Sequence, residues 1–278
     1  MIIDFHQHVL WEGWKVKDLL DYMDRAQVTQ CVIHTWEEFL GGLRADYQHI
    51  SIENTWKAYE AHPDKFIPFY SPDPLRPDAP RVLREWIARG LKGMGEHKHR
   101  MRFDDPDSVA LYKICADHGL PVLFHMESVE CAPKWYNEDI DAVDKICRQF
   151  KTVAFIGHAP GFWRHISGQP GTELYPVGKV APGGKLIRML EENPNLYADL
   201  SANSGLGALT RDPEHAVQFI RRFSGKLLYG VDSLSLNHLD YLMGLRRENR
   251  ISQEALDDIL YRNAARILKL APVAGRAT

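Results

Sequence analysis

The sequence lacks the marks of a membrane protein, a secreted protein or a nucleic-acid-binding protein. No run reaches the roughly 20 apolar residues of a membrane span, and the first residues carry no basic segment followed by a long apolar stretch. The formal net charge of −3 provides no strongly basic field for nucleic acid. We therefore expect a cytoplasmic protein that binds neither a membrane nor a nucleic acid.

Cysteine is also scarce, with four residues in a chain of 278, and no two of them form a Cys-x-x-Cys pair. This spacing indicates neither a zinc knuckle nor a disulfide framework, so we expect reduced cysteines in the core. The 45% hydrophobic and 26% charged residues are ordinary for a globular protein with a substantial core.

Short β-branched or aromatic runs alternate along the chain with longer segments of helical period. This alternation predicts β-α units around a parallel sheet. Strands are expected at residues 2–5, 30–34, 66–70, 91–95, 121–124, 153–157, 195–200 and 226–231. Helices are expected at residues 16–26, 50–61, 80–88, 108–118 and 140–150, with Gly119 as a helix C-cap.

Eight such units favour an α/β fold with a single (β/α)8 TIM-type barrel domain over residues 1–278. An open doubly wound sheet is the alternative, but no Gly-x-Gly-x-x-Gly turn follows the first strand. A last helix over residues 252–270, with Ser252 as its N-cap, is expected to cover part of the barrel. Residues 161–184 are rich in glycine and proline, and connections of that length often serve as functional lids.

Side chains that bind metals recur where the predicted strands end. His6 and His8 project from the same side of the first strand, because side chains alternate along a strand. The later strand ends carry Glu96, His125, His158 and Asp232. In a barrel, the C-terminal ends of the strands build the active site, so all six side chains are expected to converge.

A mixed set of imidazoles and carboxylates suits a borderline divalent cation. Zinc is the first choice, and Mn2+, Fe2+ or Ni2+ also fit such donors. Catalytic zinc keeps one position for water and lowers the pKa of that water to about 7. Asp232 is then the candidate that accepts the water proton, and His158 is the candidate that polarises or protonates the substrate.

This arrangement resembles the amidohydrolase superfamily, and the likeness runs from Ile3 to about Leu270. The motifs Phe-His-Gln-His, Gly-Leu-Pro-Val-Leu-Phe-His, Ile-Gly-His-Ala-Pro-Gly and Tyr-Gly-Val-Asp-Ser are most similar to the branch that contains aminocarboxymuconate-semialdehyde decarboxylase and related metal-dependent hydrolases. The resemblance implies that His6, His8, His125 and Asp232 bind metal, with His158 catalytic or a further ligand.

One position departs from the family pattern. No lysine stands where binuclear members carry a carboxylated lysine after the fourth strand, and Glu96 occurs there, similar to a bridging glutamate in some deoxyribonucleases of the superfamily. Glu96 is therefore either a ligand or a salt-bridge partner of Lys98, and one or two ions are expected. Lys98 is also a candidate anion contact.

Several other residues lie near the predicted rim without a metal-binding pattern. Asp199 is expected to be structural, and Arg164 is either an exposed arginine or a contact for a substrate carboxylate. Three aromatic residues either line the pocket or pack between loops, namely Trp36, Trp135 and Trp163. Four further histidines are expected on the surface or behind the ligands, namely His34, His97, His99 and His165.

Three functions are compatible with these residues. The first is a metal-dependent hydrolase acting on an amide, ester or lactone bond of a small molecule. The second is a non-oxidative decarboxylase of a small carboxylic acid, and the third is a non-catalytic barrel with a closed structural metal site. The resemblance is also compatible with a homodimer.

Overall fold

The strands follow one another around a common axis, with helices outside them. The computed structural model describes residues 1–37, 49–127 and 139–270. The strands are β1 (Ile3–His8), β2 (Gln30–His34), β3 (Phe66–Pro68), β4 (Met94–His97), β5 (Val122–His125), β6 (Phe155–His158), β7 (Leu196–Asp199) and β8 (Leu227–Leu228). They pair in parallel as two sheets, β1-β2-β3 and β4-β5-β6-β7-β8.

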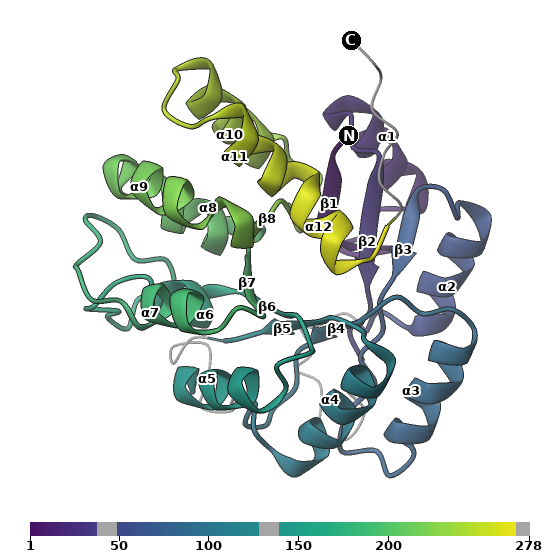
Figure 1. Ribbon diagram of the computed structural model, residues 1–278. Coiled ribbons are helices and arrows are strands. Elements are labelled where there is room, and N and C mark those ends of the chain that lie inside the picture. The colour runs from purple at the N-terminus through teal and green to yellow at the C-terminus, as the bar shows by residue number, and fades with distance from the viewer. Residues whose placement is uncertain (38–48, 128–138, 271–278) are drawn as a thin grey trace.

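Helices connect the strands and surround them in chain order (Figure 1). They are α1 (Val16–Ala26), α2 (Ile52–Ala61), α3 (Ala79–Ala88), α4 (Pro106–His118), α5 (Ile140–Gln149), α6 (Pro160–Arg164), α7 (Lys185–Glu192), α8 (Ala202–Thr210), α9 (Pro213–Phe223) and α10 (Asn237–Arg247). The predicted C-cap is confirmed, because Gly119 follows α4 in the left-handed conformation with φ of 61°.

Backbone hydrogen bonds cross both gaps between the two sheets. On one side, β3 approaches β4 through a bridge between Phe69 and Gly93, where a Cβ on Gly93 would lie 2.3 Å from the Phe69 ring. On the other side, Phe5 N donates to Tyr229 O at 2.8 Å and Asp232 N donates to His6 O at 2.9 Å. The fold is the predicted α/β barrel of the TIM type, although regular strand pairing does not run continuously around it.

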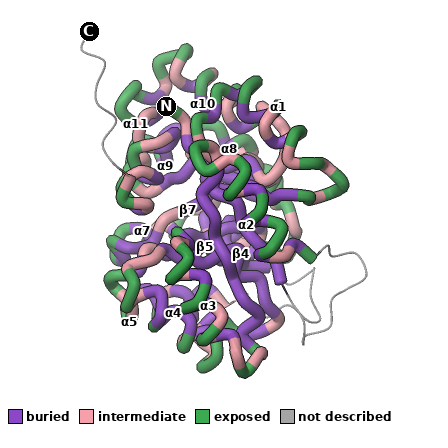
Figure 2. The backbone as a smooth tube through the Cα atoms, turned by 90° about the vertical axis from the view of Figure 1, so that its right-hand side faces the viewer, coloured by how far each residue is buried: buried purple, intermediate pink, exposed green. Residues whose placement is uncertain are grey.

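Two layers of apolar side chains stabilise this arrangement. One cluster contains side chains from the strands together with Ala264 and Ile267 of the last helix, and a second, larger cluster fills the space between strands and helices. Figure 2 accordingly shows buried strands and helices whose outer faces are exposed. The described cysteines, Cys31, Cys115 and Cys147, are buried and free, and Cys131 lies outside the described residues.

Several predicted elements have other bounds in the structure, and three of these differences matter most for the site and the barrel. The fourth strand was expected at 91–95 but begins at Met94, so Glu96 lies within β4 instead of after it. The eighth was expected at 226–231 but β8 ends at Leu228, because Tyr229 N donates to Ile259 O of the last helical segment. That segment is α11 (Gln253–Asp257), a π-helical turn (Asp258–Arg262) and α12 (Asn263–Ile267), and Ser252 caps it as predicted.

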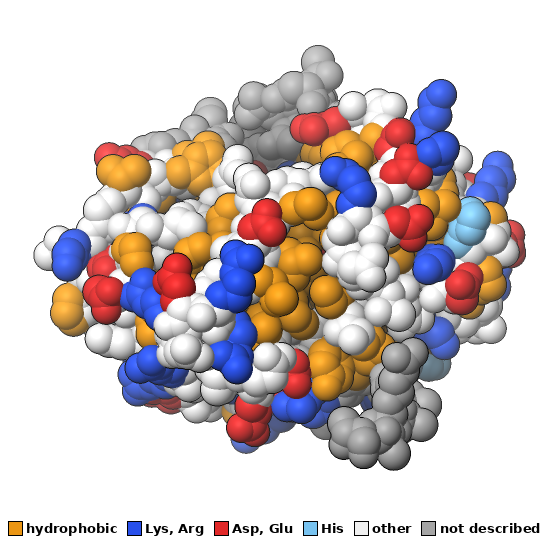
Figure 3. All heavy atoms as spheres, turned by 90° about the horizontal axis from the view of Figure 1, so that it is seen from above, with side chains coloured by type: hydrophobic (Ala, Val, Ile, Leu, Met, Phe, Trp, Pro, Cys, Tyr) orange, Lys and Arg blue, Asp and Glu red, His pale blue; other side chains and the backbone are white. Residues whose placement is uncertain are grey.

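The surface has few large exposed apolar side chains. Seen from above, hydrophobic side chains gather near the middle of one face with charged side chains around them (Figure 3). Within the described ranges, no helix is both long and apolar enough to cross a membrane. Residues 165–184 of the predicted lid contain no helix or strand.

Candidate metal centre

Six side chains predicted from the strand ends lie together at one end of the barrel. His6, His8, Glu96, His125 and His158 are each at most 8% exposed. Two groups among the six have potential ligand atoms within 4.8 Å of one another, namely His6, His8 and Asp232, and His6, Glu96 and His158. The convergence that the sequence predicted is therefore present.

His6 and His8 both direct Nε2 into the cluster. The Nδ1 of His6 lies 2.7 Å from Asp199 Oδ2, and the Nδ1 of His8 lies 3.1 Å from the carbonyl oxygen of His34. A proton on each Nδ1 satisfies these contacts and leaves each Nε2 with a lone pair, which is how metal-binding histidines are commonly oriented. The two Nε2 atoms are 3.3 Å apart.

His6 and His8 share one side of β1 because side chains alternate along a strand, and the irregular pairing of β1 with β2 lets the neighbouring Phe5 face the barrel interior as well. The register shifts between Asp4 and Gln7. As a result, Phe5 packs in the inner apolar cluster while the neighbouring His6 joins the polar cluster above it. A bulge of this kind redirects side chains and is frequent beside active sites.

Asp232 completes the first group from the segment after β8, which lies beside β1. Its Oδ1 lies 3.8 Å from His6 Nε2 and 3.5 Å from His8 Nε2. This oxygen is buried and has no hydrogen-bond partner among the described residues. Asp232 also adopts a φ of 51°, an unfavourable conformation for a residue other than glycine. Asp232 thus combines an unfavourable φ with an unsatisfied buried oxygen, two features that are frequent at functional sites.

Two side chains of β1 position Asp232 by hydrogen-bonding to the segment after β8. The Oδ1 of Asp4 accepts from His6 N at 3.0 Å and from Val231 N at 3.3 Å. The Nε2 of Gln7 donates to Ser233 O at 2.9 Å and to the second oxygen of Asp4 at 2.7 Å. Both neighbours of Asp232 are thereby attached to the strand that carries His6 and His8.

Glu96 and His125 form the second side of the cluster. The Oε1 of Glu96 lies 2.5 Å from His125 Nδ1, and its Oε2 lies 3.4 Å from His8 Nε2. The other ring nitrogen of His125 lies 3.1 Å from Glu127 Oε2. His125 is thus held between two carboxylates, and neither of its nitrogens is directed at His6 or His8. Burial and Lys98 lower the pKa of His125, but Glu127 and Glu96 outweigh them and raise it.

His158 directs one nitrogen into the cluster and the other away from it. Its Nδ1 lies 2.9 Å from Ser201 Oγ and 3.1 Å from Asp199 Oδ2. Its Nε2 lies 3.8 Å from Asp232 Oδ2 and 4.0 Å from Glu96 Oε1. Burial, followed by the neighbouring His6, lowers the pKa of His158. A neutral imidazole at this position has its Nε2 available to exchange a proton.

Asp199, which was expected to be structural, lies directly against the cluster. It contacts both His6 and His158, so its carboxylate orients two members of the cluster. Burial opposes its ionisation, but the charge of His6 and the hydrogen bonds from His158 and His6 keep its pKa well below the usual range. Its place at the end of β7 was an available signal, since the other strand ends already carried the cluster.

We expect Asp199→Asn to weaken the affinity for a divalent metal by about 10- to 100-fold, because orienting partners typically contribute that much. Competition with a chromophoric chelator measures the affinity directly. Asp117→Asn, an exposed aspartate on α4, is the matched control and should leave the affinity within twofold. Equal affinities for Asp199→Asn and the unchanged protein would contradict the orienting role.

The charges of the cluster favour a bound cation. Burial lowers the pKa of His6, but the carboxylates of Asp232, Asp199 and Glu96 raise it further, to about 10. Negative charge thus exceeds what the imidazoles neutralise, and a proton on His6 is the response in the absence of another cation. A divalent ion would satisfy the same charges and the unpartnered Oδ1 of Asp232.

The distances also fit a metal ion. Two ligands about 2.0–2.1 Å from a tetrahedral zinc are about 3.3 Å apart. The Nε2 atoms of His6 and His8 are separated by this distance. Asp232 Oδ1 lies 3.5 Å from His8 Nε2 and 3.8 Å from His6 Nε2. His6, His8 and Asp232 therefore match a metal-binding group.

The other residues considered from sequence are distributed around this cluster. Lys98 places Nζ 3.9 Å from the centre of the Trp36 ring, and Trp163 donates its ring N–H to Asp199 O at 2.9 Å. Three of the four histidines expected on the surface or behind the ligands are buried. His34 lies behind His6, while His97 and His99 contact Ser71. Burial lowers the pKa of His165 to about 4. Trp135 lies outside the described residues.

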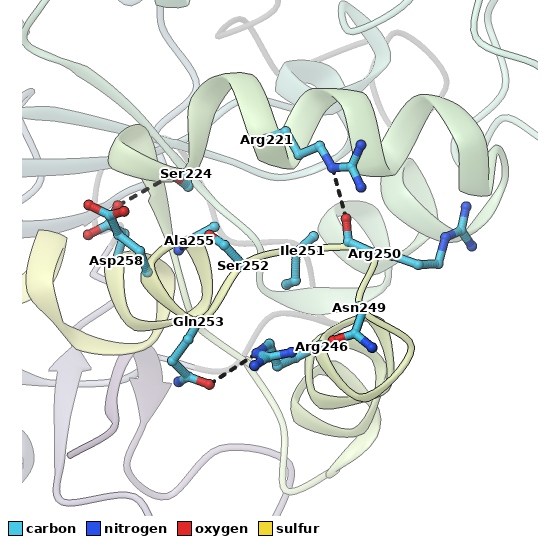
Figure 4. A pocket seen from close by; sticks show the side chains of 11 residues that line it. Arg221, Ser224, Arg246, Asn249, Arg250, Ile251, Ser252, Gln253, Ala255 and Asp258 are labelled. Carbon is cyan, nitrogen blue, oxygen red and sulfur yellow. Dashed lines mark hydrogen bonds between the residues drawn. The ribbon is translucent and has the colours of Figure 1, made fainter.

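Away from this cluster, a hollow of about 740 Å³ lies between α9, α10 and α11 (Figure 4). Its lining contains no histidine or cysteine. Its arginines already donate to protein acceptors, such as Arg221 to the Arg250 carbonyl and Arg246 to Gln253. The hollow therefore offers no catalytic group comparable with the cluster at the strand ends.

Comparison with known proteins agrees with the geometry. A family model described as amidohydrolase matches residues 3–270. No curated protein matches the chain by sequence. An uncharacterised TIM-barrel protein from Bordetella bronchiseptica has a TM-score of 0.69 at 17% identity, covering 96% of this chain and 98% of its own.

Structures with named activities share the same fold. A probable 2-pyrone-4,6-dicarboxylic acid hydrolase from Acinetobacter baumannii has a TM-score of 0.62 at 15% identity, covering 96% of this chain and 99% of its own. An amidohydrolase from Burkholderia multivorans with bound zinc has a TM-score of 0.65 at 13% identity, covering 98% and 100%. The 2,6-dihydroxybenzoate decarboxylase from Rhizobium reaches 0.57 at 14% identity, covering 97% and 98%.

Proposed function

The chain belongs to the amidohydrolase family, and from that membership we propose a metal-dependent hydrolase that cleaves an amide, ester or lactone bond of a small molecule. The protein is an enzyme, since its family and fold are those of hydrolases and decarboxylases. The observation that carries the proposal is the buried, unpartnered Oδ1 of Asp232, which faces the Nε2 atoms of His6 and His8.

We propose that His6, His8 and Asp232 hold a divalent cation, with Glu96 and His125 as further ligands. Zinc suits this mixture of imidazole and carboxylate, and Mn2+, Fe2+ or Ni2+ are alternatives. The zinc in the Burkholderia structure supports this choice. Both ring nitrogens of His125 contact carboxylates, so its participation requires one of them to be released or a second ion to bind. When bound, such a cation lowers the pKa of a coordinated water to about 7 and polarises a carbonyl oxygen.

The residues around the cation would carry the proton transfers. Asp232 would accept a proton from the attacking water and return it to the leaving group. His158 Nε2, 3.8 Å from Asp232 Oδ2, would first take up a proton and would then donate a hydrogen bond to the developing oxyanion. Asp199 and Ser201 fix the opposite side of the His158 ring, so its orientation needs no rearrangement during the reaction.

A non-oxidative decarboxylase is the second candidate, favoured by the fold shared with 2,6-dihydroxybenzoate decarboxylase. In that reaction, the cation would hold the substrate carboxylate, and His158, after taking up a proton on Nε2, would supply the proton that replaces it. The two candidates need the same side chains, so product chemistry must distinguish them. Cytoplasmic location and a homodimer stay predictions.

The test is a screen of lactones, amides, esters and aromatic carboxylates against metal-loaded protein in water enriched in 18O. We expect turnover of at least one lactone, ester or amide, with one 18O atom entering the product. Release of carbon dioxide without 18O incorporation would establish the decarboxylase instead. Tight metal binding with no exchangeable water and no turnover in this screen would contradict both candidate reactions.

A further inference from the structure

A small pocket beside α6 is lined by two arginines that belong to different β-α units. Arg164 is the last residue of α6, and Arg211 directly follows α8. Trp163, Leu174 and Tyr175 form part of the same lining. The pocket therefore lies between the connections that follow β6 and β7, where the ends of both strands carry His158 and Asp199.

The guanidinium of Arg211 is poorly satisfied by the protein. Its Nε and Nη2 atoms are buried and have no hydrogen-bond partner among the described residues. A buried donor without a partner costs free energy and calls for an explanation such as a water or an ion. Burial also lowers the pKa of Arg211, as expected of a cation without a close counter-charge.

The nearest carboxylates do not pair with Arg211. Asp212 accepts hydrogen bonds from Val180 N at 3.0 Å and from His215 N at 3.3 Å. Glu173 acts on Arg211 only through its charge, and this glutamate is exposed to solvent. The other cation of the pocket, Arg164, is 6% exposed, so one buried and one half-buried arginine line the same pocket.

Two of the arginines labelled in Figure 4, Arg221 and Arg246, provide a contrast. Both donate to protein oxygens, Arg221 is exposed and Arg246 is partly exposed, so water can satisfy their remaining donors. The buried Nε and Nη2 of Arg211 have neither a protein acceptor among the described residues nor contact with solvent. The pocket beside α6 is thus better suited to an anion than the larger hollow.

We propose that Arg164 and Arg211 form a binding site for an oxyanion, a carboxylate or a phosphate group. Guanidinium groups bind both through paired hydrogen bonds, and two of them in one pocket supply enough donors to replace the water of the anion. The anion is either a charged group of the substrate or a free ion. That the anion is a group of the substrate rests on the proposed function, whereas the binding of an anion by the two arginines does not.

The binding test uses inorganic sulfate, a tetrahedral oxyanion that binds metals weakly, with metal-loaded full-length protein at constant ionic strength. Titration calorimetry is expected to give saturable binding of about one sulfate per chain. We expect Arg211→Gln to weaken it at least 10-fold, and Arg164→Lys, which keeps the charge but loses the fork, to weaken it less. The control is Arg188→Gln on α7, an arginine with a 48% exposed side chain, which should stay within twofold.

Absence of saturable sulfate binding to the unchanged protein would overturn the proposal, as would equal binding by Arg211→Gln. Melting temperatures establish that each variant is folded. Since Arg211 is only half-buried, its replacement is expected to be tolerated, and Arg164→Lys provides an independent second variant.

The substrate test distinguishes the two sources of the anion. With an anionic substrate from the screen, a 10-fold higher KM for Arg211→Gln at nearly unchanged kcat supports a substrate group in the pocket. An unchanged KM together with weakened sulfate binding supports a free ion at the same site. Failure of the proposed hydrolase would leave the sulfate titration unaffected, so the two proposals fail separately.

Discussion

Asp232→Asn is expected to lower kcat/KM by about 10³-fold, within the range of about 10²- to 10⁴-fold typical of a general acid–base residue. Asparagine has nearly the same shape but cannot accept a proton at this position, and it removes one negative charge that would hold the cation. Steady-state kinetics on any substrate found by the screen measures the loss. The effect should appear mainly in kcat, since the remaining residues would still bind the substrate.

The matched control for this substitution is Asp240→Asn, because Asp240 is an exposed aspartate on α10 of the same β-α unit. Its kcat/KM should remain within twofold of the unchanged protein. Metal content must be measured alongside activity, so that loss of the ion and loss of the proton acceptor are separated. Retention of full activity by Asp232→Asn would contradict the proposed mechanism.

Removal of the divalent metal is the second large effect that we expect. Dialysis against a chelator should reduce turnover to background, and one equivalent of Zn2+ per chain should restore most of it. The physical reason is that His6, His8 and Asp232 can polarise neither a water nor a carbonyl oxygen without a cation. Turnover and metal content, followed through the same titration, test the expectation.

Metal removal should also lower the stability of the fold. A ligand that binds only the native state at 1,000 times its Kd stabilises it by about 4 kcal/mol, and this contribution disappears with the ion. His8→Ala should abolish most of the metal-dependent rise in melting temperature. His118→Ala, an exposed histidine of α4, is its control and should retain the rise. A chelator-treated protein with full activity and an unchanged melting temperature would contradict a metal centre.

The sequence allowed the fold and the members of the cluster to be predicted from local patterns. Alternating short apolar runs and amphipathic segments predicted a barrel, since a β-α repeat has few other ways to bury its apolar faces. Metal-binding residues at the strand ends were then identifiable, because parallel strands bring those ends to one rim. The prediction for Glu96 was less accurate in position, since it lies within β4.

Asp199 and Glu127 were harder to identify than the other members of the cluster, for two different reasons. Asp199 lies 193 residues from His6 along the chain, and no local pattern indicates that contact. Glu127 contacts His125 only two residues away, but a glutamate beside a strand end is ordinarily a solvated side chain. Residue type and spacing therefore did not identify their partners, although the position of Asp199 at the end of β7 was one available signal.

The sequence by itself determined which groups are available, namely four imidazoles and two carboxylates at the ends of strands. Only the tertiary structure decided which nitrogen of His6, His8 and His158 faces the cluster, because hydrogen bonds of their Nδ1 atoms to Asp199, the His34 carbonyl and Ser201 fix those rings. It also decided that Asp232 Oδ1 is left without a partner. The physical reason is that chemistry resides in the side chains, whereas orientation and desolvation arise from packing between segments far apart in the chain.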